Sequence, residues 1–263
     1  MLNEYIYGYI GEITLRKYIR IPKKIIYKKD IDCNRVLIWS YLYTRRSFDD
    51  TVSFSVNEIY RWAGKNADNR NNKYLSVLVD FSTLGYLGFD DYMNMSGNTY
   101  HCVNIKNFDN ERPFGIIYLD ELNQILEFKS KFPDIKRITS AHILLLLSYI
   151  RVNLNNNSPL CCYRLYKTIS DDTGIPLSYI STIVYVLEEL NILRIKELPK
   201  IQYLNSNKDL CFFTNAKVFA DYRKYDKNGI LDKSYNCNKE INKQVELLQR
   251  NFKKVNKNSK IIL

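Results

Sequence analysis

The 263-residue chain has little of what metal sites and membrane anchors require. It contains two histidines, and its six cysteines show no Cys-x-x-Cys spacing. Clustered cysteine and histidine side chains form most zinc sites, so the sequence predicts buried free thiols in a reducing compartment and no cofactor. The longest apolar run, 143–147, is too short to span a bilayer, and the N-terminus has no basic-then-apolar region. We therefore expect a soluble, cytoplasmic protein with no membrane partner.

Sequence patterns of common catalytic sites are also missing. A phosphate-binding loop reads Gly-x4-Gly-Lys-Ser/Thr, whereas Gly64-Lys65 is preceded by Ile59 at the first glycine position and followed by Asn66. His101 and His142 stand too far apart in sequence for a paired-histidine metal site. The many tyrosines are then interpreted as core and surface aromatics, and the sequence predicts a protein that is not an enzyme.

The charge of the chain indicates its class of partner. It has 39 basic and 28 acidic residues, a net charge of +11, and an apolar content of 46% that is sufficient for a substantial core. A basic protein gains affinity for nucleic acid by releasing counterions from phosphates, which favours double-stranded DNA over a membrane surface. The alternative is that the excess is the mild basicity of many soluble proteins.

One order of elements occurs twice. The first copy predicts a helix after Asp32, a strand over 51–54, a helix opened by a Ser55/Glu58 capping box, and a third helix over 69–84. The second copy predicts helices over 141–152, 165–173 and 176–190, with a strand over 160–163. Each third helix ends on Leu followed by Gly85 or Asn191, residues that accept the left-handed conformation of a helix cap, and then enters a strand.

The remaining segments connect or extend these copies. We expect a connecting helix over 118–129 between Pro113 and Pro133, and a leading strand over 5–10. Near the C-terminus, apolar residues alternate at spacings of four and three: Ile241, Val245, Leu248, Phe252 and Val255. Two heptads are too short to stand alone, which favours docking of this basic helix on the chain, with a homodimer as the alternative.

The predicted fold is α+β and mostly helical, with two tandem winged-helix domains, each a helix-turn-helix with a β-wing. The predicted boundaries are 1–107 for the first winged helix with its leading strand, 108–138 for the connecting helix, 139–220 for the second winged helix, and 221–263 for the basic C-terminal helix. In a helix-turn-helix the recognition helix enters the major groove, and its first exposed positions meet base edges.

The candidate DNA-binding residues follow from that geometry. In the first copy they open the third helix; the alternative is a polar turn whose asparagines only cap it. In the second copy the third helix offers hydroxyls but no basic residue, so nearby cations would contact phosphates. Leu75 and Val79 also fall at DNA-facing positions and suggest that another element covers part of the first helix. The full set is Asn69, Arg70, Asn71, Asn72, Lys73, Ser76, Arg164, Lys167, Ser178, Tyr179, Ser181, Thr182, Lys200 and Lys208.

Two segments carry a family resemblance. Residues 18–27, Tyr-Ile-Arg-Ile-Pro-Lys-Lys-Ile-Ile-Tyr, followed by an apolar helix, resemble the opening of winged-helix replication initiators of Gram-positive plasmids and of phage replisome organisers. Residues 173–182 resemble the turn and recognition helix of many bacterial winged helices. The resemblance covers about 18–90 and, more loosely, 139–215. It implies binding to repeats at a replication origin and recruitment of a replicative helicase or its loader.

The sequence leaves three functions open. Replication initiation through sequence-specific duplex binding is the main expectation, and a transcriptional or partition regulator is the closest alternative. A protein-interaction scaffold in a primosome or conjugation complex is the third, favoured by the apolar positions Leu75 and Val79 and by the nearly uncharged second recognition helix.

Overall fold

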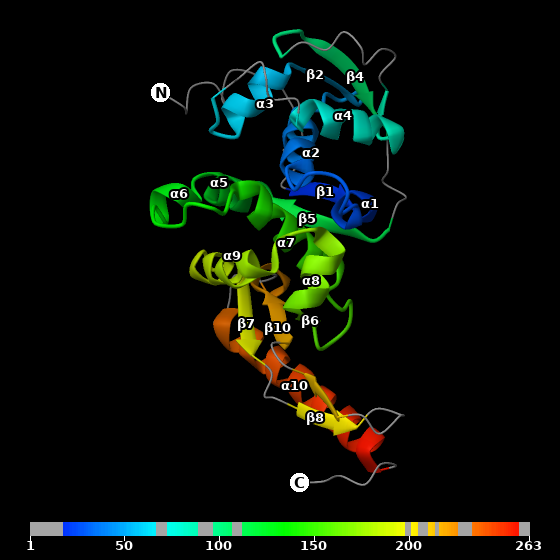
Figure 1. The fold of residues 1–263 in the computed structure, drawn as a ribbon, viewed down its shortest axis with the longest axis vertical. Coiled ribbons are helices and arrows are strands. Elements are labelled where there is room, and N and C mark those ends of the chain that lie inside the picture. The colour runs from blue at the N-terminus through cyan, green and yellow to red at the C-terminus, as the bar shows by residue number, and fades with distance from the viewer. Residues whose placement is uncertain are drawn as a thin grey trace.

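The structure is a computed structural model that describes residues 18–66, 73–88, 97–106, 112–197, 201–204, 210–213, 216–225 and 233–257. The fold is α+β, with helices packed on small antiparallel sheets. Figure 1 shows an elongated molecule in which the helices and strands of residues 35–105 lie toward one end and the C-terminal helix runs to the other. Within the described ranges, no helix is both long and apolar enough to cross a membrane.

The first unit contains α2 (Arg35–Thr44), β2 (Thr51–Phe54), α3 (Val56–Trp62), α4 (Lys73–Thr83), β3 (Leu87–Gly88) and β4 (His101–Ile105). Its three strands lie in the order β2-β4-β3, so the last strand is central. The predicted capping box is confirmed, because the Ser55 hydroxyl accepts from the Glu58 N–H and the Glu58 carboxylate accepts from the Ser55 N–H. The predicted leading strand, 5–10, lies outside the described residues.

The second unit repeats this order with α7 (Ser140–Val152), β6 (Cys161–Leu165), α8 (Tyr166–Thr173), α9 (Leu177–Glu189), β7 (Leu193–Glu197) and β10 (Ala216–Asp221). Its strand order, β6-β10-β7, again places the last strand at the centre. A hairpin of β8 (Ile201–Leu204) and β9 (Leu210–Phe213) is inserted between β7 and β10. The two units therefore share helix order and sheet topology.

Both third helices end in the same hydrogen-bonded cap. Gly85 has φ +77°, its N–H donates to Ser82 O at 2.7 Å, and the next N–H donates to Phe81 O at 2.8 Å. Asn191 has φ +53°, with the matching bonds to Glu188 O at 2.9 Å and from the following residue to Leu187 O at 3.0 Å. This pair of bonds defines a Schellman cap, which confirms the predicted left-handed residue at both positions.

The segment between the units differs from its prediction. Strand β5 (Phe114–Tyr118) comes first, then α5 (Leu119–Leu126) and the short α6 (Phe128–Lys131), in place of one helix over 118–129. β5 pairs antiparallel with β1 (Tyr18–Pro22), and Tyr18 lies opposite Tyr118. The following helix, α1 (Lys23–Tyr27), packs on α7 and α8. The strand was not anticipated because its partner is about 100 residues away, and local pattern carries no information on that pairing.

Glycine at position 115 allows β5 to lie directly on α7. A Cβ at this position would meet Ser148 O at 2.9 Å, Ser148 Cα at 3.1 Å and the tip of Ile26 at 3.0 Å. Real Cβ atoms do not approach a backbone oxygen so closely, so only glycine fits this contact between sheet and helix.

A single apolar cluster runs through both units. It includes Trp39 and Phe81 from the first unit together with Leu146 and Ile183 from the second. The buried Arg35 joins the units as well, since its guanidinium donates to Ile25 O at 2.7 Å, Ile26 O at 2.9 Å and, across the junction, Thr173 O at 2.7 Å. The domain boundaries at 107 and 138 remain a prediction, but the core is continuous across them.

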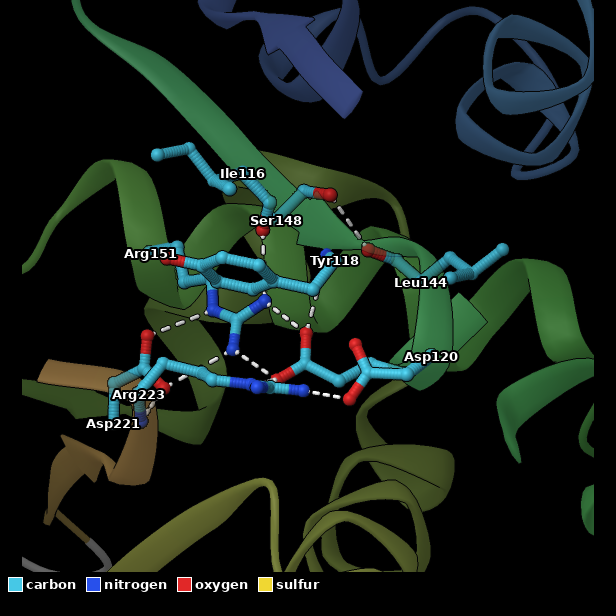
Figure 2. A network of polar contacts seen from close by, with 9 residues as sticks. Ile116, Tyr118, Asp120, Leu144, Ser148, Arg151, Asp221 and Arg223 are labelled. Atoms are coloured by element: carbon cyan, nitrogen blue, oxygen red, sulfur yellow. Dashed lines mark hydrogen bonds and ion pairs between the residues drawn. The ribbon is translucent and has the colours of Figure 1, made fainter. Parts of the chain in front are cut away.

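A buried ionic network ties the connecting segment to the second unit (Figure 2). Arg151 of α7 donates to Glu121 at 2.6 and 2.8 Å, to Asp221 of β10 at 2.8 and 3.0 Å, and to Ile116 O at 2.9 Å. Arg223 adds a bond to Glu121 at 3.1 Å and an ion pair with Asp120. Because each buried charge has an opposite partner, the network is a structural link between α5, α7 and β10.

The C-terminal helix α10 (Lys233–Lys257) docks on the second sheet. Cys237, Ile241 and Leu248 are buried against Cys161, Val218 and Ala220, with Val245 packed beside them. The predicted docking is confirmed for this half of the apolar seam. The side chains of Phe252 and Val255 lie outside the described set, and the homodimer alternative remains a prediction.

Candidate nucleic-acid interface

Helix α9 buries one side and presents the other to solvent. Ile180, Ile183 and Leu187 are fully buried, whereas Ser178 and Ser181 are exposed. Leu177 and Tyr185 are 52% and 51% exposed on the same helix. The outward face thus offers the predicted hydroxyls of Ser178 and Ser181 and the predicted Tyr185 ring, together with the apolar Leu177, which was not predicted, and the helix contains no basic residue.

Two of the α9 side chains predicted to contact DNA are partly covered by other parts of the protein. Tyr179 is half-buried, and its ring packs edge-on against His142 with centroids 5.5 Å apart. Thr182 is also half-buried. Phe132, which follows α6, packs against Tyr185 at 6.1 Å, so the connecting segment lies beside the C-terminal half of α9. Of the four α9 residues predicted to contact DNA, the exposed ones are therefore Ser178 and Ser181, in the first two turns.

Helix α4 begins at Lys73, so the predicted readers Asn69, Arg70, Asn71 and Asn72 lie outside the described residues. Lys73 and Ser76 are exposed, and the Ser76 hydroxyl donates to Lys73 O at 2.8 Å. Leu75 and Val79 are half-buried rather than open, which agrees with the expectation that part of this helix is covered.

The predicted phosphate contacts differ in availability. Arg164 is half-buried and donates to Asn153 Oδ1 at 2.5 Å and to Tyr163 O at 2.8 Å. The same cluster contains Tyr27, whose hydroxyl pairs with Asn153, so Arg164 is held inside the protein and is a weaker candidate for a phosphate. Lys167, in the first turn of α8, is exposed. Lys200 and Lys208 lie outside the described residues.

The first turns of α4 and α9 are linked indirectly, through residues 33–34 and His142 of α7. Tyr74 of α4 donates to Asn34 Oδ1 at 3.4 Å, and Lys65 donates to the same oxygen at 3.3 Å. The adjacent Cys33 contacts His142 Nε2 at 3.5 Å, and His142 packs on Tyr179 of α9. Residues 32–34 were missed as site residues, since only the fold brings them between the two helices.

The Cys33–His142 contact resembles a catalytic dyad, but the histidine is not placed to take the proton of the thiol. The Thr139 N–H donates to His142 Nδ1 at 3.2 Å, so the proton of the neutral ring is assigned to Nε2, which then cannot accept the thiol proton. Burial and the neighbouring Asp32 raise the pKa of Cys33 to about 11, and burial lowers the pKa of His142. A neutral thiol is a poor nucleophile, so this pair is a packing contact.

The cysteines agree only in part with the prediction of buried thiols. Cys161, Cys162 and Cys237 are buried and Cys33 is half-buried, whereas Cys102 on β4 is exposed. Among the described residues, no three cysteine, histidine or acidic side chains gather in a way that could hold a metal ion.

Comparison with known proteins finds no relative that could indicate the function of these residues. No model of a protein family matches the chain, and no curated protein is similar to it in sequence. Function is therefore inferred from the two units, their outward residues and the charge of the chain.

Proposed function

We propose that the two units are winged helices and that the protein binds double-stranded DNA in a sequence-specific manner. The observation that supports this most is the repeated topology. Each unit has three helices, a first strand between helices one and two, and a sheet whose last strand lies between the other two. In a winged helix the third helix enters the major groove, and here the third helices are α4 and α9.

The two third helices are proposed to contribute unequally. Asn69 to Asn72, which precede α4 in the sequence, and Lys73 at its first described position would supply amide and cationic groups, which suit adenine and guanine edges and adjacent phosphates. On α9 the exposed groups among the predicted contacts are the hydroxyls of Ser178 and Ser181, which discriminate less between bases. The first unit would then specify sequence, and the second would position the protein on the duplex.

Initiation of plasmid or phage replication is the role we propose for this binding. It rests on the resemblance of residues 18–27 and 173–182 to winged-helix initiators, together with the net charge of +11. A helicase or loader would be the protein partner. Transcriptional or partition regulation uses the same DNA-binding geometry and is separated from initiation by the location of the target site.

The proposal is tested by selecting bound fragments from the DNA of the plasmid or phage that encodes the chain. Repeats near an origin are expected, whereas a lone promoter operator would indicate a regulator. Arg70→Ala with Lys73→Ala should weaken binding to the selected site by about 2 kcal/mol or more, at about 1–3 kcal/mol per specific contact. The control is Lys106→Ala, which removes an exposed lysine of the same unit after β4.

A protein-interaction scaffold is the second candidate. The exposed Leu177 and Tyr185 on α9, without any cation on that helix, favour it. Duplex binding through phosphates gives a slope of about −0.9 in log affinity against log salt for each phosphate neutralised. Failure to retain any fragment, or a flat slope, would reject DNA binding and support the scaffold.

A further inference from the structure

The segment that leads from β1 to α2 is basic and rests on the second unit. Residues 23–29 read Lys-Lys-Ile-Ile-Tyr-Lys-Lys. Ile25 and Ile26 are fully buried where α1 packs on α7 and α8 (Figure 1). All the lysines of the segment are exposed: Lys23, Lys24, Lys28 and Lys29. Cations that precede the first unit in sequence are therefore carried on helices of the second.

The backbone of Lys29 lies against the turn between α8 and α9. Gly174 ends α8 with φ +77°, and its N–H donates to Ser170 O at 2.9 Å. A Cβ at Gly174 would meet Lys29 O at 3.2 Å and Lys29 Cβ at 3.6 Å. Helix α9 begins three residues later, at Leu177. The side chain of Lys29 therefore starts beside the turn that leads into the proposed recognition helix.

Hydrogen bonds hold this segment in place beside the turn. The buried guanidinium of Arg35 donates to Ile31 O at 2.8 Å and to Thr173 O at 2.7 Å, which joins the segment to the residue before Gly174. Within the segment, the Lys29 N–H donates to Tyr27 O at 2.9 Å. The backbone position of Lys29 relative to α9 is therefore set by contacts that do not involve its ammonium group.

We propose that Lys28 and Lys29 bind DNA phosphates beside α9, so that residues preceding the first unit complete the DNA-binding surface of the second. The inference rests on the proposed function, in which the start of α9 enters the major groove. Phosphates border that groove on both sides, and a cation next to the first turn of the inserted helix is placed to contact them. Such contacts position the protein on the duplex without reading its sequence.

The second unit needs cations at this place, because α9 itself contains no basic residue. Neither Lys28 nor Lys29 forms an ion pair with another residue that the structure describes. The acidic groups nearby are the exposed Asp30 and the half-buried Asp80 of α4. Burial raises the pKa of Asp80, and the charge of Lys28 opposes that rise. Both ammonium groups are exposed, and the backbone contact at Gly174 places Lys29 nearer to α9.

The count of phosphate contacts can be measured, because each one adds about 0.9 to the slope of log affinity against log salt. The test uses anisotropy titrations of the full chain over a range of salt concentrations. One fluorescent duplex carries the selected site, and a second, unrelated duplex has the same length.

Lys28→Ala with Lys29→Ala is expected to weaken binding to both duplexes by a similar factor and to make the slope shallower by about 1.8. Lys28→Arg with Lys29→Arg keeps both charges and should keep the slope of the wild type. The matched control is Lys106→Ala with Lys239→Ala, which removes two exposed lysines from β4 and α10 neighbourhoods and should leave the slope unchanged.

Three results would overturn the inference while the wild type still binds the duplex, and they leave the winged-helix proposal intact. These are an unchanged slope for the alanine pair, an equal change for the control pair, or a loss confined to the selected duplex. Absence of duplex binding by the wild type would reject both proposals together. Matching urea unfolding curves of variants and wild type show that a loss is not caused by misfolding.

Discussion

At the scale of single residues, a few side chains determine how closely the elements pack. Gly115 allows a strand to touch α7, Arg35 of the first unit satisfies carbonyls of α1 and of the second unit, and Arg151 neutralises two carboxylates. None of the three lies on the face proposed to bind DNA, so their substitution affects stability first.

Gly115→Ala is expected to destabilise the protein by about 1–3 kcal/mol, because the added Cβ meets Ser148 O at 2.9 Å and the backbone must move. Urea unfolding measures the change. Gly88→Ala is the matched control, since a Cβ there has only Asn104 O at 3.9 Å, and a near-neutral effect is expected. Equal effects at both positions would contradict the close contact.

Arg151→Met should lower the free energy of unfolding by about 3–5 kcal/mol, because Glu121 and Asp221 would remain buried without their shared cation. Arg223→Met, whose side chain is 28% exposed, is expected to cost clearly less. Denaturant midpoints of the two variants give the comparison. A neutral Arg151→Met would show that the network contributes no net stability.

Cys33 is expected to react slowly with iodoacetamide at pH 8. Raising a thiol pKa from 9.0 to about 11 reduces the thiolate about 100-fold at that pH, and burial adds a barrier to the reagent. Mass spectrometry of timed samples should show modification of the exposed Cys102 first. Fast alkylation of Cys33 would indicate an activated thiol and revive the dyad interpretation.

At the scale of elements, helix α10 is held to the second unit by a carboxylate as well as by its apolar seam. Glu240 accepts from the Leu160 N–H at 3.0 Å and the Ser158 hydroxyl at 2.8 Å, and it pairs with Lys243. Burial opposes the charge, but these contacts lower the pKa of Glu240 overall.

Glu240→Gln is therefore expected to destabilise the protein by about 1–2 kcal/mol at pH 7. A carboxylate whose pKa is lowered by folding adds stability above its unfolded pKa, and that stability is lost as pH falls through the folded value. The difference in free energy of unfolding between wild type and variant should accordingly become smaller from pH 7 toward pH 3, as measured by urea titration at each pH. A gap independent of pH would mean that Glu240 stabilises α10 by packing alone.

Features formed by residues close together in the sequence, such as helix starts and ends, could be predicted from the sequence. The Ser55 capping box and the helix ends at Gly85 and Asn191 were predicted because each is built within about six residues. The β1–β5 pair was not, although an isolated glycine in an apolar run, Gly115, is a signal of close backbone approach. Arg164 was predicted to contact a phosphate; the structure shows it half-buried with its guanidinium bonded to Asn153, a contact that no local pattern encodes.

At the scale of the whole molecule, the two units share one continuous apolar core, and we expect them to unfold together. Trp39 and Trp62 are the two tryptophans, and both belong to the first unit. Unfolding followed by tryptophan fluorescence should therefore coincide with unfolding followed by helical circular dichroism, which reports on both units. Two separated transitions would show that the units unfold independently, as separate domains with boundaries near 107 and 138 would.

The bond from Arg35 to Thr173 O crosses the junction to the residue that precedes the α8–α9 turn. A ligand that shifts α9 would therefore strain a side chain rooted in the first unit, and a ligand on the first unit would alter the same bond. Thermodynamic reciprocity requires each event to change the affinity of the other by the same factor. A ligand of either unit that displaces Thr173 relative to Arg35 would therefore change the affinity of the other unit for its own ligand.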